Sequence, residues 1–319
     1  MELVTLDAIR AAADRVAPVV VRTPLLESVA HPGLWLKPEN LQPTGAFKLR
    51  GATNAVLCLP PAKRSVGVVT DSSGNHGLAL AYTARRLGIP CVVVMPDVAP
   101  PFKIEAVRAL DAEVVLVPPP ERHSRALSIA SDRGLAVVPP FDHPDIIAGQ
   151  ATIGLEILAD LPSVAAVLVP VGGGGLASGV ASAVSLVSRA VRVIGVEPEL
   201  AGDAAESLRS GHLTRWSTDQ TYRTTADGLR TALSELTFAH LRERLADIIT
   251  VSEAEITSAV VELARTARLV VEPSGAVAAA AFLHHRSALG IPADAPVVAV
   301  VSGGNVAPAA LAALLTASG

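Results

Sequence analysis

The sequence is poor in aromatic residues and in cysteine. Phe, Trp and Tyr together make up 3% of the 319 residues, so the interior must be built mainly from Ala, Val, Leu and Ile. Such an interior suits helices that pack closely on a parallel sheet, whose strands are continuous apolar runs. The two cysteines, Cys58 and Cys91, are too few for a disulfide framework and lack the spacing of metal ligands. We therefore expect free thiols in a reducing, cytoplasmic compartment.

Charge of either sign is also scarce. Lys and Arg number 26 and Asp and Glu 30, which gives a net charge of −4 and no basic footprint for nucleic acid or an anionic membrane surface. The first ten residues lack an apolar run, so no secretory signal is expected. Residues 161–188 carry no charge and could span a bilayer by length, but Pro170 and the glycines 172–175 interrupt them. We expect a strand, a tight loop and a helix there, and neither a membrane nor a nucleic-acid partner.

Short apolar runs alternate with amphipathic, Ala-rich stretches along the chain. This alternation is typical of βαβ units and predicts an α/β fold with mainly parallel sheets. The runs fall into two groups, which indicates two domains: residues 1–61 plus 142–319 form the large one, and residues 62–141 the small one. The expected strands are 67–70, 90–95, 113–117, 135–138, 166–170, 192–197, 247–251 and 296–301, and the expected helices are 75–87, 102–110, 122–133, 146–158, 176–188, 253–268 and 275–284.

Ligands of such sheets bind at the carboxyl ends of the strands, where loops meet helix N-termini. Four loops carry unusual residues. The first, residues 38–51, is rich in Pro, Thr and Gly and leads into a helix that begins near Phe47. Lys48 would lie in the first turn of that helix, where the macrodipole disfavours a cation and lowers the pKa of an amine. The position suits a reactive amine, although for a lone lysine a solvated surface position is the commoner explanation.

Two further loops offer polar groups at sheet edges. In residues 71–77, Ser73 and Asn75 supply hydrogen-bond donors, and the N-terminus of the next helix offers free N–H groups to a carboxylate. The alternative is a serine N-cap with ordinary turn residues. Residues 302–305, Ser-Gly-Gly-Asn, place a hydroxyl after the last strand, or form an ordinary strand-to-helix turn.

The remaining loop is a run of four glycines, 172–175, after the strand 166–170. Such a run lets the backbone fold tightly around an anion, with the positive end of the next helix directed at it. It predicts a phosphate cradle but no P-loop, since no Lys-Ser/Thr pair follows. Gly172-x-Gly174-x-x-Ala177 also fits the dinucleotide fingerprint, with Glu197 near the expected distance for a ribose ligand. A NAD-binding oxidoreductase is therefore a second interpretation of this motif.

Taken together and in this order, the four loops resemble those of the fold-type II pyridoxal-phosphate (PLP) enzymes, in the branch of the serine/threonine dehydratases and serine racemase. The resemblance runs from Thr23 to Asn305 and so covers nearly the whole chain. It implies a tryptophan-synthase-β-like architecture, PLP as the cofactor, a small amino-acid substrate and a homodimer. It rests on the segments 45–51, 73–77, 172–175 and 302–305.

The resemblance also implies roles by matching position. Lys48 would carry the cofactor as an imine and act as acid and base on one face, while Ser73 would serve the opposite face, as in serine racemase. Phe47 would pack beside the ring, Asn75 would hold the ring hydroxyl, and Ser302 would bond the pyridine nitrogen. The phosphate would bind to Gly172, Gly173, Gly174, Gly175 and Leu176, and the substrate carboxylate to Ser72, Ser73, Gly74, Asn75 and His76.

The implied activity is elimination of water from a small hydroxy-amino acid such as L-serine or L-threonine, which yields a 2-oxo acid and ammonia. A neutral hydroxyl at the pyridine nitrogen does not favour a fully protonated ring, so charge at Cα should expel a β-hydroxyl. Racemisation of serine stays open, because a base on each face of Cα is what racemisation requires. Dehydration of another hydroxy-amino acid, such as 3-hydroxyaspartate, stays open as well.

Two acidic positions complete the expectations. By the same resemblance, Glu197 and Asp203 would hold a divalent cation together with the backbone carbonyl of Ala201, and oxygen-only ligands suit Mg²⁺ or Ca²⁺. The alternative is two solvated acids in a turn. Glu272 either lies near the cofactor ring or is an ordinary acid at the start of a helix.

Overall fold

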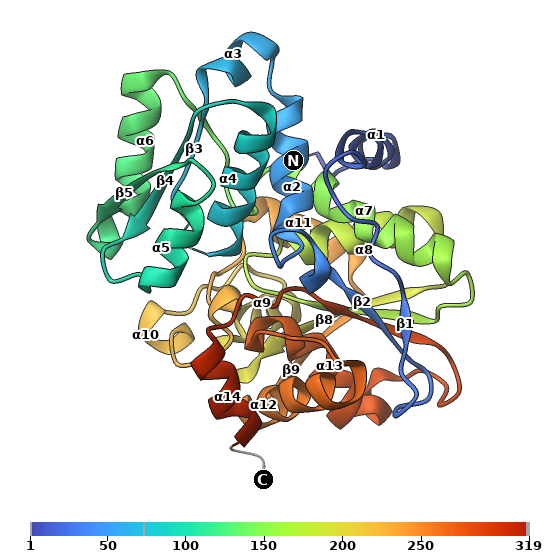
Figure 1. Ribbon diagram of the computed structural model, residues 1–319. Coiled ribbons are helices and arrows are strands. Elements are labelled where there is room, and N and C mark those ends of the chain that lie inside the picture. The colour runs from blue at the N-terminus through green and yellow to red at the C-terminus, as the bar shows by residue number, and fades with distance from the viewer. Residues whose placement is uncertain (1, 73, 317–319) are drawn as a thin grey trace.

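The larger of two sheets forms the base of the molecule. The computed structural model describes residues 2–72 and 74–316, and Figure 1 shows this sheet in its lower part. The strand order is β1-β2-β10-β7-β8-β9; β1 pairs antiparallel with β2, and the other neighbouring pairs are parallel. The strands are β1 (Leu26–Glu27), β2 (Leu34–Pro38), β7 (Ala166–Pro170), β8 (Arg192–Pro198), β9 (Asp247–Val251) and β10 (Val297–Val301).

A smaller sheet lies beside it, with four parallel strands in the order β5-β4-β3-β6. Its strands and helices form the upper left part of Figure 1. We call the part of the chain from α3 to β6 the small lobe, and the rest the large lobe. The small lobe contains α3 (Pro61–Val66), β3 (Val68–Thr70), α4 (Asn75–Leu87), β4 (Cys91–Pro96), α5 (Pro101–Arg108), β5 (Glu113–Val117), α6 (Arg122–Arg133) and β6 (Ala136–Val137).

Helices cover both faces of the larger sheet. On one face α13 packs against β7, β8, β9 and β10, and on the other α8 packs against β7 and β8. The buried residues of α13 are mainly alanines, as the scarcity of aromatic residues predicts, and small side chains let a helix approach the sheet closely. The helices of the large lobe are α1 (Leu6–Val16), α2 (Lys48–Cys58), α7 (Pro144–Asp160), α8 (Gly175–Val187), α9 (Asp203–Ser210), α10 (Thr218–Thr221), α11 (Glu235–Arg244), α12 (Glu253–Glu262), α13 (Pro273–His285) and α14 (Pro308–Thr316).

The predicted α/β class with mainly parallel sheets is confirmed, and all eight expected strands are present. The uncharged stretch 161–188 forms β7, the glycine loop and α8, as predicted. No helix among the described residues is both long and apolar enough to cross a bilayer. The prediction of one α-helix over 253–268 is wrong in its second half. There α12 is followed by a π-helix, Leu263–Ala267, whose C-cap residue, Arg268, has a φ of 61°.

Candidate active site

Lys48 is the first residue of α2, as the sequence predicts. The start of this helix is fixed to the end of β10, because the N–H of Phe47 donates to the carbonyl of Ser302 at 3.0 Å. The Lys48 Nζ donates to the carbonyl of Pro140 at 2.7 Å and lies 5.2 Å from the centre of the Phe47 ring. Burial of the amine lowers the pKa of Lys48 to about 8, so about a tenth of it is uncharged at pH 7, far more than for a solvated lysine.

A buried ionic network holds the helix that carries Lys48. Arg50 is fully buried and donates to both carboxylate oxygens of Glu39, at 2.7 and 2.8 Å. It also donates to Glu156 at 2.7 Å, and the same carboxylate accepts from Lys37 at 2.6 Å. Bidentate arginine–carboxylate pairs fix direction as well as distance. The network therefore sets the orientation of α2 only two residues beyond Lys48.

The glycine loop lies between β7 and α8, where the sequence places a phosphate cradle. A Cβ on Gly173 would come within 2.6 Å of the Phe141 ring, and Gly174 has φ of 86°, which favours glycine. Across residues 2–72 and 74–316, no protein acceptor is paired with the backbone N–H groups of Gly173, Gly174 or Gly175. Free N–H groups at the positive end of a helix are the donors that a phosphate needs.

Asn75 belongs to a polar cluster that joins the small lobe to the large lobe. Its side-chain N–H donates to Glu272 at 2.7 Å, and its carbonyl oxygen accepts from Asn305 at 2.8 Å. Glu272 is the N-cap residue of α13, yet its side chain makes no capping bond and turns toward Asn75 instead. Burial, with the charge of Asp227 adding to it, raises the pKa of Glu272 to about 7. Glu272 therefore lies at the start of a helix, as one of its two expectations has it, and its place near the cofactor ring stays a prediction.

The loop expected to bind a substrate carboxylate precedes α4. Ser73 lies outside the described residues. A Cβ on Gly74 would meet nothing within 4 Å, and the first turn of α4 leaves N–H groups for an anion. His76, by contrast, is buried, and its Nε2 is bonded to the carbonyl of Val138 at 3.0 Å. Burial, then the charge of Lys48, lowers the pKa of His76 to about 3, so its ring is neutral near pH 7.

Ser302 lies directly after β10 and is buried. Its hydroxyl is 3.4 Å from the carbonyl of Ser274, the second residue of α13. Next to it, a Cβ on Gly303 would lie 2.2 Å from the Glu272 carboxylate, so the backbone there is tightly enclosed. The hydroxyl is thus held at the carboxyl end of the larger sheet, as the sequence predicts.

Four contacts join the four loops into one site. Lys48 meets Pro140, and the following residue, Phe141, packs on the glycine loop. Phe47 meets Ser302, and the loop before α4 meets the last loop through the Asn75–Asn305 bond. An amine of lowered pKa, a cradle that tolerates no Cβ and a buried hydroxyl fit the aldehyde, phosphate and ring nitrogen of PLP.

The residues expected to hold a cation are buried, so the alternative of two solvated acids is wrong. Glu197 and Asp203 are 1% and 2% exposed, and Ala201 is fully buried. Glu197 accepts the N–H groups of Ala204 at 3.1 Å and Ala205 at 2.7 Å. Burial raises the pKa of Glu197 and brings that of Asp203 to about 6. Among the described residues, the Asp203 Oδ2 is buried without a hydrogen-bond partner, so this oxygen could bind a cation.

The same contacts remove the support for a dinucleotide site. A ribose ligand would need a free carboxylate at the end of β8. The Glu197 carboxylate is instead buried and bonded to the N-terminus of α9. The dinucleotide interpretation of the glycine motif is therefore wrong.

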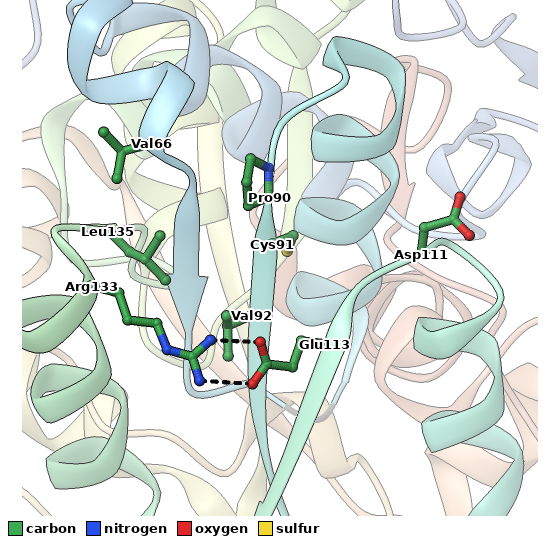
Figure 2. A pocket seen from close by; sticks show the side chains of 8 residues that line it. All are labelled: Val66, Pro90, Cys91, Val92, Asp111, Glu113, Arg133 and Leu135. Carbon is green, nitrogen blue, oxygen red and sulfur yellow. Dashed lines mark hydrogen bonds and ion pairs between the residues drawn. The ribbon is translucent and has the colours of Figure 1, made fainter.

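A cavity of about 330 Å³ lies at the amino ends of the small-lobe strands. Figure 2 shows Cys91 at the start of β4 and the ion pair between Arg133 and Glu113, all three of which line the cavity. None of the predicted site residues lines it. Since parallel sheets bind ligands at their carboxyl ends, this cavity does not belong to the site.

Two contributors to the site carry no clear signal in the sequence. Pro140 and Phe141 touch Lys48 and the glycine loop, yet the sequence around them indicates only a proline-rich connection. Asp227 lies in the 3₁₀-helix η4 (Asp227–Leu229), which packs on Gly172, and no motif points to it. Only the tertiary structure brings these residues to the site.

Comparison with protein families agrees with this geometry. The model of the family described as "Pyridoxal-phosphate dependent enzyme" matches residues 16–303. The chain belongs to this family, and PLP is its cofactor.

Individual relatives cover almost the whole chain. An L-threo-3-hydroxyaspartate ammonia-lyase of Saccharomyces cerevisiae is 39% identical over 92% of this chain and 91% of its own. An L-threonine ammonia-lyase of Thermotoga maritima is 41% identical over 95% of this chain and 76% of its own. The structure of maize serine racemase superposes with a TM-score of 0.91 at 33% identity, over 99% of this chain and 98% of that one.

Proposed function

We propose that the protein is a PLP-dependent lyase that removes water from a small hydroxy-amino acid such as L-serine or L-threonine. The products are a 2-oxo acid and ammonia. Its main support is the Lys48 amine, which has a lowered pKa and lies at the head of a helix bonded to the Ser302 loop. The two ammonia-lyase relatives support the same class of reaction.

Different residues of the site would have different roles in the reaction. PLP, once bound, supplies an electron sink that acidifies the Cα–H bond of the substrate. Lys48 would carry the cofactor and then take the Cα proton, for which a pKa of about 8 suits an enzyme working near neutrality. The N–H groups at the start of α4 would hold the substrate carboxylate.

The remaining contacts orient the cofactor. The glycine loop would bind its phosphate, and the Ser302 hydroxyl would bond its ring nitrogen without adding charge. The Asn75 amide gives one N–H to Glu272 and keeps a second for the ring hydroxyl. Because Ser302 is neutral, the electron pair at Cα would form the Cα–Cβ double bond and break the Cβ–O bond, and the hydroxyl would leave as water with the proton that Lys48 took.

Borohydride reduction followed by peptide mapping tests the cofactor site. We expect a PLP adduct on Lys48 and its loss in Lys48→Ala, whereas Lys63→Ala, at an exposed lysine of α3, should keep it. Incubation with L-serine, L-threonine and 3-hydroxyaspartate, with assay of 2-oxo acid and enantiomers, then identifies the reaction. A colourless protein without an adduct at Lys48 would refute the proposal.

Racemisation is a second activity that the sequence favours. Ser73 stands where serine racemase has the acid or base of the opposite face, and a serine racemase is among the structural relatives. We expect Ser73→Ala to abolish D-serine formation from L-serine while elimination continues. Unchanged D-serine formation in this variant would remove Ser73 from that role.

We further propose that residues 62–141 move as a domain and close over the substrate, and that the protein is a cytoplasmic homodimer. The separate sheets of the two lobes support the closure, since closing lobes exclude water from a reaction. Light scattering of the purified protein tests the dimer. A mass of one chain across the working concentration range would contradict it.

A divalent cation at Glu197, Asp203 and the Ala201 carbonyl is proposed as a stabilising ligand. Two buried carboxylates with raised pKa values would bind Mg²⁺ or Ca²⁺. The charge of the cation would offset the free-energy cost of burying the two negative charges. Either cation should raise the Tm of wild type and leave Asp203→Asn unchanged. Equal shifts in both proteins, or none in either, would count against the site.

A further inference from the structure

Lys103 and Asp227 form an ion pair across the boundary between the lobes. The Lys103 Nζ on α5 lies 3.1 Å from the Asp227 Oδ2 on η4. Among the ion pairs of residues 2–72 and 74–316, this one alone joins the small lobe to the large lobe. In Figure 1, α5 lies at the lower border of the small lobe, toward the large lobe.

The pair lies beside the residues expected to hold the cofactor ring. The Asp227 Oδ1 is 3.5 Å from the Ser274 hydroxyl, and the Ser302 hydroxyl bonds the Ser274 carbonyl. The N–H of Gly228 donates to the Ser274 hydroxyl at 2.9 Å, which ties η4 to the start of α13. Both charges also act on Glu272: burial raises its pKa, Asp227 adds to the rise, and Lys103 opposes it.

The small lobe also carries the loop before α4, which would hold the substrate carboxylate. A contact between α5 and η4 therefore favours one distance between this loop and the glycine loop, since η4 packs on Gly172. The Lys103 and Asp227 side chains are 25% and 46% exposed. They can separate and meet again without the cost of stripping water from a fully buried pair.

We propose that Lys103 and Asp227 are a positioning pair that holds the small lobe closed over bound substrate. The inference rests on the proposed lyase function and its closing lobe. Neither residue touches the reacting atoms in this scheme. Their attraction favours the closed arrangement, in which the amine of Lys48 and the carboxylate-binding loop face the same substrate.

The test uses the PLP-loaded enzyme and steady-state kinetics with the better of L-serine and L-threonine. Lys103→Met and Asp227→Asn should each lower kcat/KM about two- to fivefold, mainly through KM, as expected for a partly exposed ion pair. The charge swap Lys103→Asp with Asp227→Lys, and the conservative Lys103→Arg, should recover most of the loss. Arg133→Met removes an ion pair within the small lobe and serves as the matched control.

Two results would overturn the proposal. In one, both single variants have the KM of Arg133→Met. In the other, the charge swap is as impaired as the worse single variant, so that mutual attraction is not what matters. Cofactor absorbance and Tm, recorded for every variant, exclude loss of PLP or of folding. If wild type itself forms no adduct at Lys48 and no 2-oxo acid, the lyase function fails; if wild type is active, only the positioning pair is at stake.

Discussion

Replacing Glu272 with glutamine should remove a pH dependence from the free energy of unfolding. Burial, and then Asp227, raises the pKa of Glu272 from 4.5 to about 7. A carboxyl with a higher pKa in the folded state stabilises that state most at low pH, and this contribution is lost as the pH rises through the folded-state pKa. A change of one pKa unit corresponds to about 1.4 kcal/mol, so the raised pKa of Glu272 changes the free energy of unfolding by about 3 kcal/mol in all.

Urea unfolding of PLP-free protein at about pH 5 and about pH 8 measures the effect. Between these two values, wild type should lose about 2 to 3 kcal/mol more stability than Glu272→Gln, since other groups titrate alike in both proteins. The amide introduced by Glu272→Gln would retain an oxygen to accept the Asn75 N–H, so the hydrogen bond itself is conserved. Glu105→Gln, at an exposed position of α5, should behave as wild type. An identical pH dependence in wild type and Glu272→Gln would refute the reasoning.

Three further substitutions test the packing beneath the site. Gly173→Ala puts a Cβ 2.6 Å from the Phe141 ring; PLP affinity in an absorbance titration should fall about tenfold, and Phe141→Leu should restore part of it. Gly149→Ala puts a Cβ 2.7 Å from the backbone of α2, and the free energy of unfolding should drop by about 1–3 kcal/mol in urea. Arg50→Met leaves the Glu39 carboxylate buried without its partner and should cost about 3–5 kcal/mol, seen as a lower Tm. A Tm equal to that of wild type would show that the buried network does not hold α2.

Strands that are buried on both faces could be predicted closely from the sequence. β7 has the expected bounds, because an uninterrupted apolar run bounded by turns defines it. β2 was not predicted, since it contains Lys37, a charge that usually marks the surface. The Lys37 side chain is fully buried only because Glu156 lies against it, 119 residues away in the chain.

Some residues of the candidate site could likewise be predicted from the local sequence, and others could not. Lys48 and the glycine loop stand out locally, because a cation at a helix start and consecutive glycines are unusual in any fold. Glu272 could not be assigned, since an acid before a helix-starting proline is ordinary. Its side chain is directed by Asn75, which the sequence places 197 residues earlier. The Lys103–Asp227 pair likewise joins elements whose proximity depends on how the two lobes meet.

The connection at Pro140 and Phe141 has a mechanical consequence. The chain leaves the small lobe through these residues, so the segment that joins the two lobes also touches Lys48 and the glycine loop. Any swing of the small lobe would shift the Pro140 carbonyl beside Lys48 and the Phe141 ring beside the glycine loop. The colour of the bound cofactor should therefore report, without any added label, how far the lobes have come together.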